Sequence, residues 1–300
     1  MITFAIPCYN SNYIYLRHAI DSVLAQDCNQ WKLIIVDGNK MPDSNLEKLV
    51  LSLKHGSVLY RYNEADKSMA GNWNFCFEVA DTELVCLLHD DDFLSISYTR
   101  EMLKLTEKKP SASAYFCSVN LINAQNKRAY ALADCVKEVI KPKGELVVLA
   151  GDNGLASLLK GCYIYCPSLV YRKSMICSAP FDSNWSMVTD LKFYTEILLN
   201  GGTIVGTSDR LFNYRRHNNN QTAILTDDLQ RFKEELDVYD SLLPILSMKK
   251  WKRSYYQANL KIIIRFTKVS TKLLLPCPIK LLTKVLVAEL NPNNGIINTM

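Results

Sequence analysis

Three consecutive carboxylates, Asp90, Asp91 and Asp92, follow the apolar run Glu83–Leu88. The run has the length and composition of a buried strand, so the acids fall where that strand breaks into a loop. Adjacent carboxylates repel one another and prefer water, and a divalent cation compensates most simply for gathering them. The triplet therefore predicts a cation site, although an acidic turn in which Asp92 caps the next helix explains it about as well.

Two more acids occupy positions that suit the same site. Asp37 closes the apolar segment that begins at Trp31, where taken alone it is more typical of a turn before Gly38. Asp190 lies at the predicted start of a helix, where an acid either interacts with the helix dipole or serves as a general base. Because ligands bind outside the carboxyl ends of parallel strands, we expect Asp37 and the triplet to share one crevice.

A polar segment, Leu211–Thr222, contains the consecutive residues Arg215, Arg216 and His217. We interpret it as a loop. Two guanidinium groups suit a diphosphate, and an imidazole suits a metal ion. A histidine in a polar loop usually has no catalytic part, so this segment supports a site only together with the acids.

Alternating strand and helix patterns must position these residues. Apolar runs predict strands over 2–7, 31–37, 57–62, 83–88 and 112–120, and amphipathic patterns predict helices over 15–26, 45–53, 71–80 and 99–107 and after Asp190. The opening βαβαβ order is typical of an α/β protein with a mostly parallel sheet covered on both faces.

Composition narrows the classes further. The 300 residues are enough for one α/β domain and a smaller appendage. The ten cysteines include no CxxC pair, which favours reduced thiols in the cytosol, and no apolar stretch is long enough to cross a membrane. Neither GxGxxG nor a P-loop is present, so a phosphate must be held by other means, such as a metal ion on carboxylates.

In their order along the chain, these motifs resemble the family 2 glycosyltransferases over roughly residues 1–222. The ordered set is far more specific than any one of its members. Its members are Ile6–Asn10, Ala19–Gln26, Leu33–Asp37, Leu88–Asp92, Thr189–Asp190 and Tyr214–His217. The resemblance implies a GT-A, Rossmann-like fold, a nucleotide-sugar donor, Mn²⁺ or Mg²⁺, and inversion at the anomeric carbon.

The resemblance also implies a role for each site residue. The donor-binding residues are Pro7, Tyr9, Asn10, Asp37, Asp90, Asp91 and Arg215, the metal ligands are Asp91, Asp92 and His217, and the catalytic base is Asp190. Asp37 would hydrogen-bond the base of the nucleotide, and the acidic segment would contact the ribose and the metal that bridges both phosphates.

The chain departs from the family pattern at three places. Gly38 follows Asp37 where relatives commonly carry a second acid, so we expect recognition of the base or ribose to differ. His89 occupies the first position of the common Asp-x-Asp-Asp segment, which leaves open which acid binds the metal, with Asp91 favoured. Thr189 replaces a common Glu, but the base at Asp190 is kept.

Positive charge is concentrated at the end of the chain. Residues from Lys249 onward carry a net charge of +9, against −4 for residues 1–248. Basic, aromatic and apolar residues alternate there, including Leu260–Val269 and Ile279–Leu290, and suit an anionic membrane better than nucleic acid or a solvated helix face. We expect a glycosyltransferase domain over 1–225 and a helical region over 226–300 that contacts a membrane through 249–300.

The predicted function is transfer of a hexose or N-acetylhexosamine, with UDP favoured in the donor, to a hydroxyl of a saccharide. A lipid-linked acceptor at the cytoplasmic face of the plasma membrane, as in O-antigen or capsule assembly, fits the basic C-terminal region, and nucleic acid is not expected as a partner. The alternatives are a metal-dependent nucleotidyltransferase and a non-catalytic, glycosyltransferase-like binding protein.

Overall fold

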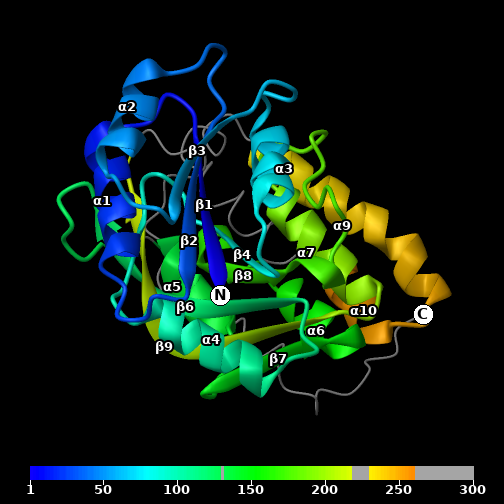
Figure 1. Ribbon diagram of the computed structural model, residues 1–300. Coiled ribbons are helices and arrows are strands. Elements are labelled where there is room, and N and C mark those ends of the chain that lie inside the picture. The colour runs from blue at the N-terminus through cyan, green and yellow to red at the C-terminus, as the bar shows by residue number, and fades with distance from the viewer. Residues whose placement is uncertain (130–131, 218–229, 261–300) are drawn as a thin grey trace, which may run out of the picture. The chain divides into compact units, whose positions relative to one another are not determined.

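The structure is a computed structural model in which residues 1–129, 132–217 and 230–260 are described (Figure 1). The contacts between residues group Met1–Lys261 into one compact unit. The predicted segment Leu260–Val269, beyond its first residue, and the predicted segment Ile279–Leu290 lie outside the described residues. So does residue 225, the predicted domain boundary.

The N-terminal half alternates strands with helices. Its elements are β1 (Ile2–Cys8), α1 (Tyr13–Leu24), β2 (Trp31–Asp37), α2 (Ser44–Ser52), β3 (Val58–Tyr62), α3 (Met69–Val79), β4 (Leu84–Leu87), β5 (Phe93–Leu94), α4 (Tyr98–Lys108) and β6 (Ala114–Asn123). The predicted βαβαβ opening is confirmed, with ends that shift by one or two residues.

The second half contributes further strands and helices. Its elements are α5 (Leu132–Ile140), β7 (Leu146–Ala150), α6 (Gly151–Leu158), η1 (Cys166–Ser168), β8 (Leu169–Arg172), η2 (Lys173–Met175), α7 (Thr189–Leu199), β9 (Thr203–Arg216), α9 (Gln230–Met248) and α10 (Lys252–Leu260). The predicted loop over Leu211–Thr222 is wrong for its first part, because Leu211–Arg216 complete the long strand β9. Phe212–Arg216 pair with β6, and Phe212 and Asn213 pair with β5 on the other side.

All strands in the described part of the chain belong to one sheet. Its order is β3-β2-β1-β4-β8-β6-β9-β5, and β7 pairs with β9. Strands β3, β2, β1 and β4 are mutually parallel, whereas β8 runs antiparallel to both β4 and β6. β6 and β9 are parallel, and β5 and β7 are antiparallel to β9. The N-terminal half is therefore the Rossmann-like part, and the rest of the sheet is mixed.

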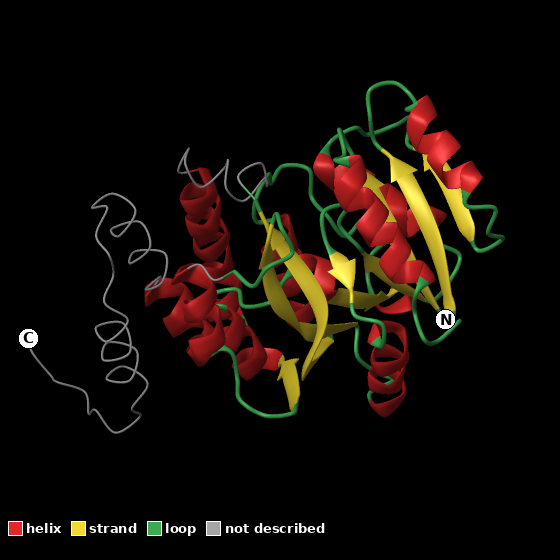
Figure 2. Cartoon of the chain, turned by 90° about the vertical axis from the view of Figure 1, so that its left-hand side faces the viewer, coloured by secondary structure: helices red, strands yellow, loops and turns green. Residues whose placement is uncertain are grey.

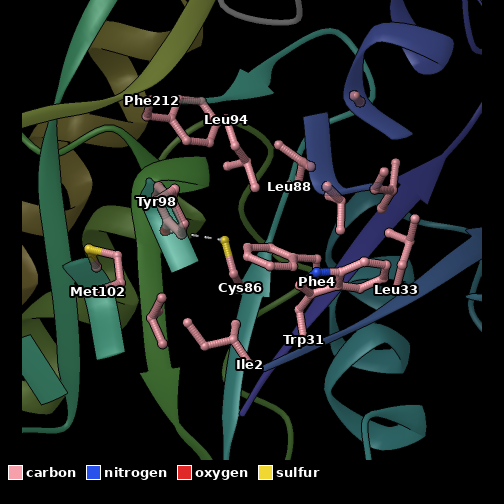
Figure 3. Packing of buried hydrophobic residues seen from close by; sticks show 14 of the residues in the cluster. Ile2, Phe4, Trp31, Leu33, Cys86, Leu88, Leu94, Tyr98, Met102 and Phe212 are labelled. Atoms are coloured by element: carbon pink, nitrogen blue, oxygen red, sulfur yellow. Dashed lines mark hydrogen bonds between the residues drawn. The ribbon is translucent and has the colours of Figure 1, made fainter. Parts of the chain in front are cut away.

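The core lies on both faces of the central strands, and helices are packed on each side of the sheet (Figure 2). On one face, Phe4, Leu33 and Cys86 from three adjacent strands lie in one apolar cluster, and Phe4 and Cys86 contact Tyr98 of α4 (Figure 3). The phenol of Tyr98 also donates a hydrogen bond to the carbonyl of Ser168, which ties α4 to the antiparallel strands. Strands buried on both faces read as continuous apolar runs, which is why the sequence predicted them well.

The C-terminal helices α9 and α10 pack on each other, and α10 packs on α6. The carboxylate of Asp152 in α6 accepts hydrogen bonds from the backbone N–H groups of Arg253 and Ser254. Asp152 therefore caps the N-terminus of α10 from a neighbouring helix. No helix among the described residues is both long enough and apolar enough to cross a bilayer.

Candidate active site

The acidic turn, defined here as Asp90–Asp92, lies between β4 and β5. β1 pairs in parallel with β2 on one side and with β4 on the other. Asp37 is the last residue of β2 and the acidic turn follows β4, so both lie at the carboxyl edge of the parallel strands. The sheet thus brings together acids that are more than fifty positions apart in sequence.

The acidic turn is electrostatically costly. Burial, and then the neighbouring Asp91 carboxylate, raise the pKa of Asp90 to about 6. The same two causes raise the pKa of Asp92 well above its usual range, and Asp92 is only 1% exposed. Buried carboxyl groups whose pKa is raised are a common mark of a functional site, and a bound cation would favour their charged forms.

Arg215 holds the acidic turn from β9. Its backbone N–H donates to Oδ1 of Asp92 (2.7 Å), and its Nε donates to the carbonyl of Asp91 (2.7 Å). The guanidinium also donates to the carbonyl of Asn123 and lies 4.4 Å from the ring centre of Tyr15. The predicted donor contact of Arg215 stays a prediction. The structure shows a fully buried side chain that fixes the turn.

Two histidines flank the acidic turn. Nε2 of His217 lies 2.9 Å from Oδ2 of Asp91, and the His217 ring packs against Tyr15 with ring centres 5.5 Å apart. His89 packs against Trp73, with ring centres 5.3 Å apart. The sequence motifs singled out His217 but treated His89 only as a missing acid.

One group among the described residues has the composition and spacing of a metal site. It consists of a ring nitrogen of His89 and one carboxylate oxygen each from Asp91 and Asp92, and these three atoms lie within 4.8 Å of one another. Nε2 of His89 and Oδ2 of Asp92 are buried and have no hydrogen-bond partner in the described part of the chain. Such unpaired atoms are available as ligands, so the residues present fit a divalent cation.

Asp37 is fully buried and organises the loop after β2. Its Oδ1 accepts hydrogen bonds from the backbone and side chain of Asn39, and its Oδ2 accepts from the backbone N–H of Asp43 and the hydroxyl of Tyr60. A Cβ at Gly38 would lie 2.6 Å from the side chain of Asn72. This close approach gives a steric reason why no second acid follows Asp37.

The loop after β1 lies beside this edge. Pro7 is still within β1, whereas Tyr9 and Asn10 are exposed. Asn10 has a φ of 50°, a conformation that Asn tolerates better than most residues, and its N–H donates to Oδ1 of Asn39. This hydrogen bond connects the loops that follow β1 and β2, so the predicted nucleotide-flanking residues lie at the edge that carries Asp37.

Asp190 lies in the first turn of α7, as predicted, and its Oδ1 accepts a hydrogen bond from the N–H of Leu191. A run of ring contacts leads from the acidic turn to this helix. Trp73 lies against both His89 and Phe181, and Phe181 lies against Phe193, one turn after Asp190. The run joins the part of the fold that carries the acidic turn to the part that carries the predicted base.

Two residues that the motifs did not identify hold the segment that leads into α7. The Asn74 side chain makes two hydrogen bonds to the backbone of Phe181, donating to its carbonyl and accepting from its N–H. The Glu234 carboxylate from α9 accepts from the backbone N–H groups of Ser186, Met187 and Val188. Nothing in the local sequence distinguishes Glu234 from other helix acids, because its partners lie more than forty positions away.

Arg216 and Arg215 are neighbours in β9 but contact different residues. Its guanidinium forms an ion pair with Asp134 of α5, and the hydroxyl of Tyr165 donates to the same carboxylate (2.8 Å). Asp134 is 1% exposed, so the pair is largely removed from water. Arg216 thus anchors α5 against the end of β9.

Comparison with known proteins identifies the N-terminal part. Residues 3–151 match the family described as "Glycosyl transferase family 2". WcaA of Escherichia coli K12, a glycosyl transferase assigned by its name to colanic acid biosynthesis, is 27% identical over 122 residues, which cover 39% of this chain and 43% of that protein. An uncharacterized glycosyltransferase of Rickettsia prowazekii is 26% identical over 185 residues, covering 58% and 52% of the two chains. The chain therefore spans about half the length of the curated relatives it matches.

Solved structures agree on the fold. Residues 1–349 of TarS from Staphylococcus aureus superpose with a TM-score of 0.57 at 15% identity, covering 79% of this chain and 65% of that one. The complex of the same protein with UDP-GlcNAc gives a TM-score of 0.59 at 14% identity, covering 79% and 66%. At this identity, the similarity shows a shared GT-A fold.

Proposed function

Because this chain belongs to glycosyltransferase family 2, we propose that it is an inverting glycosyltransferase that uses a nucleotide sugar and a divalent cation. The observation that carries the proposal is the acidic turn at the carboxyl edge of the parallel strands. Buried Oδ2 of Asp92, and Nε2 of the preceding His89, have no hydrogen-bond partner among the described residues. Turns at this edge are where open α/β sheets bind ligands.

We assign a separate role to each of the chain's own residues at this site. Asp91 and Asp92 would hold Mn²⁺ or Mg²⁺, with His217 in contact with Asp91. When bound, the cation neutralises the negative charge of the departing nucleoside diphosphate. Arg215 keeps the acidic turn in place through the carbonyl of Asp91. Asp190 takes the proton from the acceptor hydroxyl, which attacks the face of the sugar opposite the leaving group.

We propose UDP as the nucleotide and a hexose or N-acetylhexosamine as the sugar. The related fold of TarS has been solved with UDP and with UDP-GlcNAc, which supports this class of donor. Pro7, Tyr9 and Asn10, with Asp37 behind them, would line the nucleotide, and Asp90 would approach the ribose.

The acceptor we propose is a saccharide on a lipid carrier, reached from the cytoplasmic face of the membrane. Support comes from the relative named for colanic acid biosynthesis and from the basic turn, defined here as Met248–Arg253. Met248 is 85% exposed, and the four cationic residues of the turn are all exposed. Exposed apolar and cationic groups on one turn suit an anionic membrane surface.

Product analysis with a panel of donors tests this function. The full chain is incubated with UDP, GDP, dTDP and CMP sugars and with nucleoside triphosphates, in the presence of Mn²⁺ or Mg²⁺. We expect release of a nucleoside diphosphate from a nucleotide sugar, and loss of this release with EDTA. Release of pyrophosphate from a triphosphate would instead indicate a nucleotidyltransferase, and binding without release would indicate a non-catalytic protein.

A further inference from the structure

Two ligand-type atoms at the acidic turn remain without a partner although they are buried. They are Nε2 of His89 and Oδ2 of Asp92, and the described residues offer neither a hydrogen bond. An unsatisfied buried polar group costs about 1–3 kcal/mol. Two such atoms in residues only three positions apart are therefore best explained by a shared partner that completes the site.

The spacing suits a single ion. A nitrogen of His89 and oxygens of Asp91 and Asp92 lie within 4.8 Å of one another. Ligands at about 2.0–2.2 Å from a cation are at most about 4.4 Å apart, so a small closure of the group would bring all three into coordination. Oδ1 of Asp92 accepts a hydrogen bond from the N–H of Arg215, which fixes the carboxylate and leaves Oδ2 for the ion. The His89 ring packs against Trp73, which fixes the imidazole.

We propose that His89, Asp91 and Asp92 form one cation site with mixed nitrogen and oxygen ligands, and that His89 shifts its preference from Mg²⁺ towards transition metals such as Mn²⁺ and Co²⁺. The role of the ion in catalysis depends on the proposed function, whereas its binding to these three residues does not. An imidazole is a poor ligand for Mg²⁺ and a good one for later divalent metals. It also replaces a carboxylate, so the site carries one negative charge fewer.

His217 is the competing nitrogen ligand, because its Nε2 contacts Asp91. The two histidines are distinguishable by substitution. His89→Phe removes the imidazole while keeping a ring against Trp73, and His217→Phe does the same beside Tyr15. His55→Phe is the matched control, since His55 stacks on Trp31 with ring centres 5.2 Å apart and lies outside the group of His89, Asp91 and Asp92.

The first measurement is pulsed electron paramagnetic resonance of Mn²⁺ added to the full chain without nucleotide. We expect a ¹⁴N coupling from a directly bound imidazole in the wild type, in His217→Phe and in His55→Phe, and its loss in His89→Phe. A coupling that persists in His89→Phe, or that disappears in His217→Phe, would overturn the assignment. Should His89→Phe fail to fold, His89→Gln removes the imidazole with a polar side chain and carries the same expectation.

The second measurement is calorimetric titration with Mg²⁺, Mn²⁺ and Co²⁺. We expect the wild type to bind Co²⁺ more tightly than Mg²⁺, and His89→Phe to lose more than about tenfold in Co²⁺ affinity while Mg²⁺ affinity changes much less. Equal losses for both metals, or no binding of any of the three, would overturn the proposal. Cation-dependent release of UDP from a UDP-sugar is measured separately, so that failure of the mixed site and failure of the proposed function remain distinguishable.

Discussion

The backbone N–H of Arg215 donates a 2.7 Å hydrogen bond to Oδ1 of Asp92, although 123 positions separate the two residues. The guanidinium of Arg215 reaches the carbonyl of Asp91 at the same time. Strand β9 therefore fixes both the carboxylate and the main chain of the acidic turn, and β5, which follows the turn, pairs with β9 as well. The position of the acids depends on a strand that arrives late in the chain.

Arg215→Met should lower the free energy of unfolding by about 3 kcal/mol or more. The variant leaves the buried carbonyls of Asp91 and Asn123 without their donor and removes the positive charge that favours ionised Asp92. Urea unfolding followed by circular dichroism measures this loss. Arg17→Met is the control, since Arg17 is exposed and its ion-pair partner among the described residues is Asp21. Equal unfolding midpoints for the two variants would contradict the anchoring role.

Asp190→Asn should reduce kcat by about a hundred- to ten-thousand-fold, because the amide cannot accept the proton of the acceptor hydroxyl. Affinity for UDP should change little, since donor binding is assigned to other residues. Steady-state kinetics and thermal melting with UDP and Mn²⁺ separate the two effects. Asp209→Asn, an exposed acid on β9, should leave both unchanged; unaltered turnover in Asp190→Asn excludes it as the base.

Glu234→Ala should lower kcat while leaving KM for the donor nearly unchanged, because the variant releases three backbone N–H groups that hold the start of α7. Glu234→Gln keeps an acceptor oxygen and should recover most of the loss. Asp237→Ala, an exposed acid in the same helix, is the control. A general loss of stability without a selective fall in kcat, or no recovery in Glu234→Gln, would show that Glu234 does not position Asp190.

The sequence was sufficient for the parallel strands and for the acids at their ends. Continuous apolar runs such as Leu33–Val36 leave little choice of structure, and strand ends in a parallel sheet meet at one edge. Contacts between residues far apart in the chain could not be predicted from the sequence. Glu234 and Asn74 look like ordinary helix residues, and the buried state of Arg215 depends on pairing between β6 and β9.

Asp152→Ala should destabilise the attachment of α10 by about 1 kcal/mol, the usual value of a lost helix cap. Burial raises the pKa of Asp152, but hydrogen bonds from Ser254 and from the N–H of Arg253 outweigh it, so the pKa is lowered overall. A lowered folded pKa contributes stability that is present above the unfolded pKa and is lost as pH falls through the folded pKa.

The stability difference between wild type and Asp152→Ala should therefore be constant near neutral pH and shrink as the pH falls below about 4. Chemical unfolding at a series of pH values measures it. The control variant Asp209→Ala removes an exposed acid from strand β9, and its stability difference from the wild type should show no comparable trend. A difference that grows on acidification would mean that the carboxylate is not the stabilising form.

The basic turn gives the proposed membrane contact a test within the described residues. Lys249 and Lys250 are exposed beside Met248, and the capped start of α10 fixes the turn. Each Lys or Arg near an anionic bilayer contributes about 1 kcal/mol, so charge reversal in Lys249→Glu/Lys250→Glu should reduce binding by about tenfold or more. Flotation with vesicles that contain phosphatidylglycerol measures binding at low and high salt.

The same reversal on α4, Lys104→Glu/Lys108→Glu, controls for the change in net charge, because those lysines are equally exposed but lie on another helix. We expect the control to float like the wild type at low salt and the basic-turn variant to remain in solution. High salt should release all of them, since the attraction is electrostatic. Equal flotation of both variants would show that the basic turn is not the contact. Failure of the wild type to float would mean that the acceptor has to be sought away from an anionic membrane.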